Sequence, residues 1–179
     1  MKRFLIGLLI LILIAFLVLN MNTSTNKTDT LKAQLNEIEK LIEKRDVKNE
    51  AVSKADIAWH LDHMLKTMNG ISKAMENSDP ANYESSFNMM KLMSLGIGYI
   101  PRGTAQAPES VRPPDNILTQ DIISQLADAR QNIEMANALN KNAYFNHFVF
   151  GNLNRPTSLR LLEVHNKHHL KIVRDILGE

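Results

Sequence analysis

The chain has 179 residues, with 21 Lys and Arg against 19 Asp and Glu, and it contains no cysteine. Because Lys2 and Arg3 account for the whole excess of positive charge, the remainder is neutral, which argues against a nucleic-acid-binding protein. The lack of cysteine excludes disulfides, thiolate zinc sites and cysteine nucleophiles. About 150 residues beyond the N-terminal region are enough for one domain with a real core.

An uncharged run extends from Phe4 to Leu19, directly behind Lys2 and Arg3. As a helix it would span roughly 24 Å, slightly less than a typical bilayer core, so it can cross a thin or locally adapted bilayer. A signal peptide has the same charged start and apolar middle, but no convincing Ala-x-Ala cleavage site follows. We therefore predict residues 1–21 to be an uncleaved transmembrane signal anchor, with the rest of the chain on the extracytoplasmic side. The alternative is secretion after signal cleavage.

Residues 22–30 are polar and predict a tether, so the domain itself is expected to cover residues 31–179. Apolar residues recur at helical spacing at its start: Leu31, Leu35, Ile38 and Ile42. This pattern predicts a short amphipathic helix, either packed on the domain or serving as its stalk.

The next helix is predicted to begin at Ser53, a favoured N-cap residue. On its helical wheel His60 lies at the margin of the apolar stripe, whereas His63 lies further round, toward Trp59. His60 is therefore the better-directed metal ligand. His63 is the reserve, and we favour a solvated or Trp-packed histidine over a ligand there. Asp62 points away from the stripe and is expected to be a solvated charge.

Two further helices are predicted over residues 81–96 and 119–139, and a long irregular segment with four prolines separates them. The methionines of the first helix are expected to fill the core. Thr119 is expected to cap the second, with Ile123 facing inward. An irregular segment of this length is often functional or crosses the domain. Its Arg102 either recognises an anion or, as the better default, pins the loop.

The last helix carries His165 and His169, one turn apart on the face that also holds Leu162, Ile172 and Val173. Two inward imidazoles at this spacing can reach one divalent metal, and a ligand from another helix would complete a facial set. The alternative is two core histidines bonded to backbone or carboxylate groups, although burying both without strong partners is costly. His168 lies at the edge of the stripe and is the weaker candidate.

Three features together resemble the DinB-like superfamily of metal-binding helical bundles: Ser53 seven positions before His60, the segment Phe150-Gly-Asn-Leu153, and His165-x-x-x-His169. The resemblance covers roughly residues 31–177 and is greatest to a branch described only as domains of unknown function. It implies one metal ligand from an early helix and two from a late helix, which are His60, His165 and His169. Some members of the superfamily transfer low-molecular-weight thiols or open small rings, whereas most have no assigned reaction.

Long amphipathic helices, one long crossover and no persuasive strand alternation predict an all-α fold. Together with the resemblance to the DinB-like superfamily, these features predict a four-helix bundle of DinB-like type, with an N-terminal transmembrane helix and an extra short amphipathic helix. His147 is either near the site or packed among neighbouring phenylalanines, which we favour.

The expected cofactor is a divalent metal ion, Zn²⁺, Ni²⁺ or Fe²⁺. The expected partners are the membrane and a small-molecule substrate. Two functions stay open: a metal-dependent hydrolase or thiol transferase, or a non-catalytic membrane-anchored binding module with a structural metal or none.

Overall fold

The computed structural model describes residues 2–23, 28–103 and 106–179, without the side chains of residues 2–4 and 23. These residues are mostly helical. The elements in chain order are α1 (Lys2–Thr23), α2 (Thr28–Leu41), η1 (Ile42–Lys44), α3 (Ile57–Glu76), η2 (Pro80–Asn82), α4 (Met89–Ile97), η3 (Glu109–Val111), α5 (Thr119–Ala138), β1 (Tyr144–His147), β2 (Gly151–Asn154) and α6 (Arg155–Leu177).

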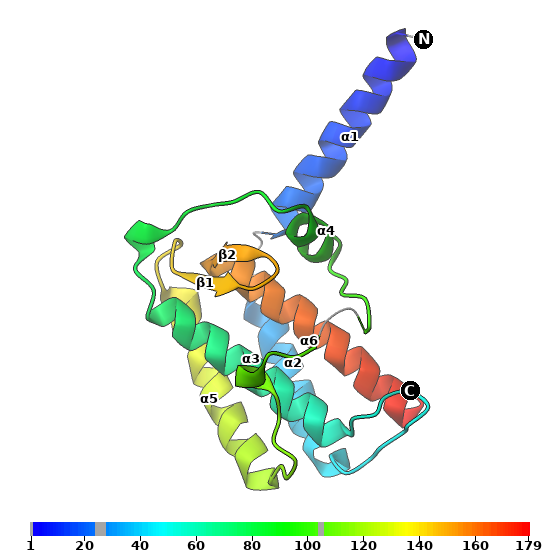
Figure 1. Ribbon diagram of the computed structural model, residues 1–179, viewed down its shortest axis with the longest axis vertical. Helices are drawn as coiled ribbons and strands as arrows, with labels where there is room; N and C mark the ends of the chain where they lie inside the picture. The colour runs from blue at the N-terminus through cyan, green and yellow to red at the C-terminus, as the bar shows by residue number, and fades with distance from the viewer. Residues whose placement is uncertain (1, 24–27, 104–105) are drawn as a thin grey trace.

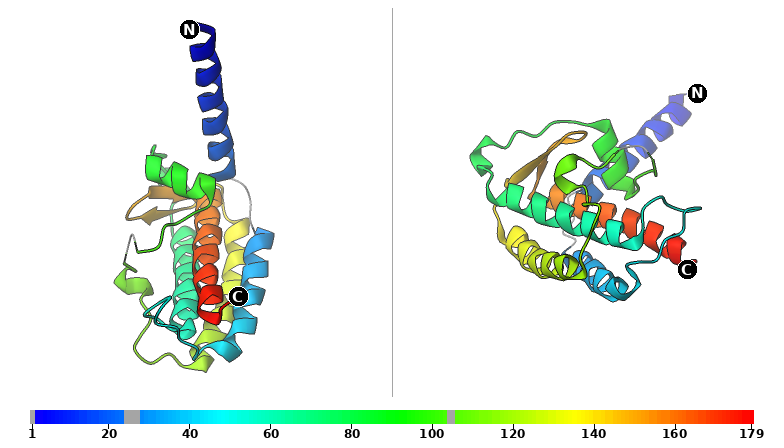
Figure 2. Two further views of the ribbon diagram at one scale, coloured as in Figure 1. Left: turned by 90° about the vertical axis from the view of Figure 1, so that its right-hand side faces the viewer. Right: turned by 60° about the horizontal axis from the view of Figure 1, so that its bottom comes forward.

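The helices α2, α3, α5 and α6 lie side by side around one apolar core (Figures 1 and 2). Both α2 and α3 pack against α5 and against α6, so each helix has two neighbours. The amphipathic faces meet in a core that includes Leu31, Leu35, Leu61, Met64, Met68, Leu126, Ile133, Leu162 and Val173. Of the two alternatives for the helix near residues 31–42, packing on the domain is therefore the one observed.

Helix α3 begins at Ile57, and its N-cap is Asp56 rather than Ser53. The Asp56 carboxylate accepts a hydrogen bond of 2.9 Å from the Trp59 amide, which satisfies one of the free N–H groups of the first turn. The Ser53 hydroxyl accepts instead from the Ala55 amide, at 3.1 Å, in the turn before the helix. The predicted cap was wrong by three positions.

Helix α4 begins at Met89 instead of residue 81, because Pro80 opens the short turn η2 and an irregular segment follows it. The prediction that the methionines here fill the core is wrong, since Met89, Met90 and Met93 are all exposed. Helix α4 lies outside the group of four long helices, where it packs against α1 and one side of α6.

A short antiparallel hairpin, β1–β2, precedes α6 and contradicts the expectation of a purely helical chain. Its register pairs Phe145 with Leu153 and His147 with Gly151. Strands of four residues are marginal on their own. The hairpin packs against α3 and α6, so its stability depends on tertiary contacts that no local pattern displays.

Helix α5 confirms the helix predicted over 119–139, but two details differ. Thr119 is not a cap; its Oγ1 accepts a hydrogen bond of 3.0 Å from Arg45 instead. Ile123, expected to face inward, is exposed. The segment before α5 crosses the domain, where η3 packs on α3, and Arg102 pairs with Asp175, which makes it a loop-pinning residue.

Most of helix α1 projects away from the four long helices (Figure 1), and its C-terminal end contacts α4. Its stretch Leu5–Asn22 is long and apolar enough to cross a membrane, by length and composition. Of the predicted tether 22–30, residues 24–27 lie outside the described residues, and its two ends belong to α1 and α2. The side chains of Lys2 and Arg3, on which the predicted orientation rests, also lie outside the described part.

Candidate metal centre

Four histidines meet where α3 packs against α6. His60 and His63 come from α3, and His165 and His169 come from α6. The ring centroid of His63 lies 5.0 Å from that of His165 and 4.8 Å from that of His169. The ring centroids of His165 and His169 are 4.6 Å apart. The structure thus brings together all three predicted ligands and the reserve, His63.

Three of these residues form the most compact group: His63, His165 and His169. One ring nitrogen of each lies within 4.8 Å of the other two. The Nε2 atoms of His63 and His165 are 3.1 Å apart. Two nitrogens that each bind one Zn²⁺ at about 2.0–2.1 Å lie roughly 3.3–3.4 Å apart at the ideal tetrahedral angle. The observed 3.1 Å corresponds to an N–metal–N angle of about 95–100°, so it fits two ligands of a single ion with a moderately closed angle.

The imidazole of His63 is held in the orientation that a ligand needs. Its Nδ1 lies 2.8 Å from the carbonyl oxygen of Val111, which can only accept, so Nδ1 carries the proton and donates it. Nε2 is left with its lone pair directed at His165. Metal-binding histidines characteristically donate their second ring N–H to a carbonyl or carboxylate in this way. Trp59 stacks on the same ring, with the two centroids 5.0 Å apart, so the predicted packing of His63 against Trp59 is observed.

His60, the third ligand expected from the sequence, lies beside the compact group rather than in it. Its Nδ1 is 3.0 Å from Nδ1 of His169, and its Nε2 is 3.2 Å from Oγ of Ser53. One consistent proton arrangement has His169 donate to His60 and His60 donate to Ser53. Nε2 of His169 then stays free for a metal ion.

The packing around the cluster keeps its histidines neutral. Burial is the main cause that lowers the pKa of His60 to about 4, with smaller contributions from the nearby His63, His168 and Arg102. Burial likewise lowers the pKa of His165 to about 3 and that of His169 well below its usual value. Neutral imidazole is the form that binds metal. Nδ1 of His165 is buried without a hydrogen-bond partner among the described residues. The donor set therefore fits a divalent cation.

Asp62, expected to be a solvated charge, is only 1% exposed. Its Oδ2 lies 2.7 Å from Nζ of Lys66, one turn further along α3, and its Oδ1 accepts a hydrogen bond of 2.7 Å from Gln125 of α5. The carboxylate is buried because α5 covers this side of α3. It faces α5 rather than the histidines; Oδ1 accepts the hydrogen bond, whereas Oδ2 has the ion pair with Lys66 but no hydrogen bond among the described residues.

The two remaining histidines lie at the periphery. His168 is half-buried, with its ring centroid 5.1 Å from that of His169. His147 stacks between Phe148 and Phe150, with centroids 4.7 and 4.6 Å away, and its Nδ1 accepts from the backbone amides of residues 149 and 150. Packing, the favoured interpretation for His147, is confirmed.

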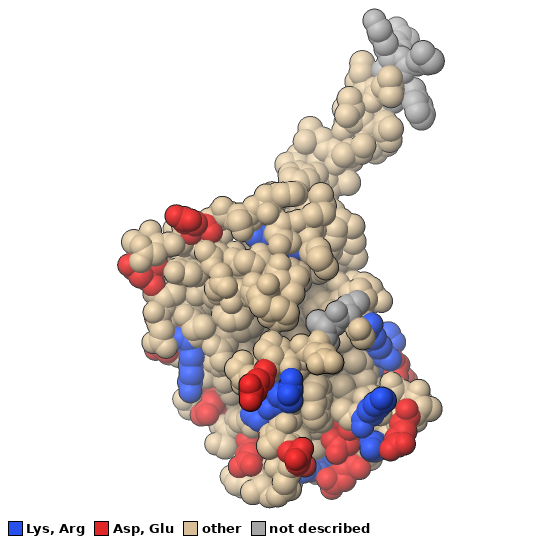
Figure 3. Space-filling view, viewed as in Figure 1, with Lys and Arg blue, Asp and Glu red and all other residues tan. Residues whose placement is uncertain are grey.

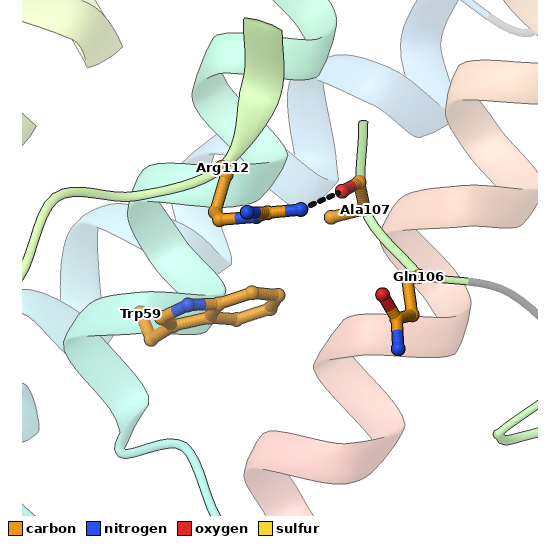
Figure 4. A pocket seen from close by; sticks show the side chains of 4 residues that line it. All are labelled: Trp59, Gln106, Ala107 and Arg112. Carbon is orange, nitrogen blue, oxygen red and sulfur yellow. Dashed lines mark hydrogen bonds between the residues drawn. The ribbon is translucent and has the colours of Figure 1, made fainter. Parts of the chain in front are cut away.

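A cavity of about 370 Å³ opens beside the cluster and is lined by Trp59, Gln106, Ala107 and Arg112 (Figure 4). The Arg112 guanidinium lies over the face of the Trp59 ring, and its Nη2 donates to the Ala107 carbonyl at 3.3 Å. Trp59 is thus a wall shared by the cavity and by His63. Sequence reasoning missed Arg112 and the Val111 carbonyl, and the only signal for either was the long proline-rich segment that carries them.

The family model described as "Protein of unknown function (DUF1569)" matches residues 21–176. The chain belongs to this family. The match includes all four clustered histidines, and it leaves out α1 except for its last three residues, together with the extreme C-terminus. Comparison with curated proteins and with solved structures found no match.

Proposed function

We propose that α2, α3, α5 and α6 form a DinB-like four-helix bundle that binds one divalent metal ion for chemistry on a small molecule. The protein ligands are His63, His165 and His169, with His60 orienting His169. The observation that carries this proposal is the pair of facing Nε2 atoms, 3.1 Å apart, with the His63 tautomer fixed by Val111. Zn²⁺, Ni²⁺ and Fe²⁺ all suit a set of imidazole ligands.

A three-histidine site leaves coordination positions open, so a bound ion would supply a Lewis acid and lower the pKa of a coordinated water. Hydrolysis and thiol transfer both fit that chemistry. The surrounding residues have separate tasks. Trp59 shields one face of His63, and the Arg112 side chain offers a cation to an anionic group of a substrate in the adjacent cavity.

The proposal includes anchoring to a membrane by α1, with the bundle on the extracytoplasmic side; release after signal cleavage is the alternative. The support is the length and composition of Leu5–Asn22. The full-length chain should stay with the membrane fraction after an alkaline wash and be degraded by external protease in spheroplasts. A soluble protein that starts near residue 22 would establish cleavage instead.

A non-catalytic binding module with a structural metal, or none, is the second candidate. Asp62, the carboxylate next to His63 in the sequence, is engaged by Lys66 and Gln125 and is therefore not poised as a general base. This observation favours the second candidate over an enzyme that needs a protein base.

Cobalt substitution separates the two candidates without knowledge of the substrate. The full-length chain in detergent, purified without a histidine tag, would be loaded with Co²⁺ and titrated with azide. An open three-histidine site should show visible absorption bands that change as azide binds, and His63→Ala should lose those bands. Bands that azide leaves unchanged would indicate a closed, structural site. Failure to bind Co²⁺, Zn²⁺ or Ni²⁺ at all would refute the metal centre.

A further inference from the structure

Helix α4 is apolar on two faces, and only one of them is covered. Leu92, Leu95 and Gly96 are buried against the rest of the chain. The other face exposes four apolar side chains within an arc of about 100°, at positions i, i+1, i+4 and i+8. They are Met89, Met90, Met93 and Ile97. A helix with this distribution has an unsatisfied apolar surface.

Exposed aromatic side chains flank α4. Phe87, just before α4, is 70% exposed, and Tyr99, just after it, is 63% exposed. The tip of the β1–β2 hairpin is tied to α4 by a hydrogen bond of 3.0 Å from Asn88 to the Val149 carbonyl, and the adjacent Phe148 is 65% exposed. Figure 3 shows that most of the visible charged side chains lie toward the opposite end of the molecule from α1.

The position of α4 connects this surface to the candidate membrane span. The absence of a side chain at Gly96 lets the α1 backbone approach, because a Cβ there would lie only 2.9 Å from side-chain atoms of Leu19. The Asn22 side chain donates a hydrogen bond of 2.5 Å to the Gly96 carbonyl. Helix α4 therefore packs at the C-terminal end of Leu5–Asn22, the level at which α1 would leave a bilayer (Figure 1).

Helix α4 is also fixed to the domain. The Arg160 guanidinium of α6 donates through Nε to the Leu95 carbonyl at 2.9 Å, and its Nη1 pairs with Glu163 at 2.5 Å. The helix ends at Gly98, whose φ of 75° is a left-handed conformation that favours glycine. The exposed face of α4 is thus held in one direction relative to the four long helices.

We propose that the exposed face of α4, with Phe87, Tyr99 and Phe148, is a second membrane contact that lies in the interfacial layer of the bilayer. This inference rests on the proposed anchoring by α1. Lipid is the occupant because the face continues from the candidate span and carries aromatic and flexible apolar side chains rather than charge. Two contacts, a spanning helix and an interfacial helix, would fix the orientation of the histidine cluster relative to the membrane.

A single fluorescent label tests the proposal, since the chain has no cysteine to compete. Met93→Cys would be labelled with an environment-sensitive dye in the full-length chain reconstituted into phosphatidylcholine vesicles. Val47→Cys is the matched control, because Val47 is 40% exposed against 45% for Met93 and lies in the cyan segment far from α1 (Figure 1). Ile97→Cys provides a second position on the proposed face if Met93→Cys does not fold.

We expect the dye at position 93 to emit at shorter wavelength than the dye at position 47. Spin-labelled lipid should quench most of the fluorescence at position 93, and aqueous iodide should quench little of it. At position 47 iodide should quench strongly and spin-labelled lipid weakly. Equal quenching by iodide at both positions in vesicles that still carry the protein on flotation would overturn the proposal while leaving anchoring intact. Energy transfer between labelled copies without lipid quenching would assign the face to a second copy. Protein that does not float with vesicles would refute anchoring itself.

Discussion

Substituting His63 by Ala should remove most of the metal affinity, and His60→Ala should remove less. His63 supplies one of the three close ring nitrogens, and its Nε2 is 3.1 Å from that of His165. His60 contacts the group through Nδ1 of His169. Loss of a residue that orients a ligand costs about 10–100-fold in affinity. That range corresponds to about 1.4–2.7 kcal/mol, and loss of a ligand from the three-residue set should exceed it.

Isothermal titration with Zn²⁺ measures both effects on the full-length chain in detergent, with circular dichroism to confirm folding. His168→Ala is the matched control, since His168 is next to His169 in the sequence but lies outside the compact group. Its affinity should stay close to that of the unsubstituted chain. If His60→Ala abolishes binding and His63→Ala does not, the ligand set is the one that the family resemblance implies. Unchanged metal content in the His165→Ala/His169→Ala double variant would exclude the site altogether.

Two further predictions concern stability, both measured by urea unfolding of the metal-free chain. Asp62→Ala should lower the free energy of unfolding by about 2–4 kcal/mol, because it leaves Lys66 and Gln125 without a buried partner; an effect below about 1 kcal/mol would contradict this. The free energy of unfolding should also fall as the pH drops from about 6.5 toward 4. The pKa of His60 is about 4 in the folded chain and returns to its ordinary value on unfolding, so over this range the unfolded chain binds a proton that the folded chain does not. A urea midpoint that does not change over this pH range would contradict the inference that the clustered histidines are neutral. The His60→Phe variant should show a weaker dependence of stability on pH.

Much of the helical framework could be predicted from the sequence because its signals are local. The apolar periodicity that placed α5 over residues 119–139 needs no knowledge of the partner helix, and the structure ends it at Ala138. The i,i+4 spacing likewise predicted that His165 and His169 share a face, and their rings are 4.6 Å apart. Both inferences follow from helix geometry alone.

The errors arise where an exposed or buried state depends on a distant segment. Asp62 was expected in solvent because it points away from the apolar stripe of its own helix, but α5 supplies Gln125 and covers it. The methionines of α4 were expected inside because methionine usually is, whereas α4 is placed beside α1 and exposes them. Neither outcome is encoded in a local pattern.

The choice between His60 and His63 depends on such a distant contact. Residues three apart on a helix differ by about 60° in direction, so both can face the same neighbouring helix. Both are 4% exposed in the structure. A helical wheel ranks them only by distance from the apolar stripe. The Val111 carbonyl adds what the wheel omits, since it takes the Nδ1 proton of His63 and directs Nε2 toward His165.

One segment, residues 98–112, connects the features on which the function would depend. It starts where α4 ends, pairs with α6 through Arg102 and Asp175, forms a wall of the cavity with Arg112, and fixes His63 through Val111. The candidate metal centre is therefore built from two helices and this irregular segment, whose Val111 carbonyl fixes the tautomer of His63. Because the segment is continuous with α4, a membrane contact at α4 would hold one end of the segment that completes the candidate site.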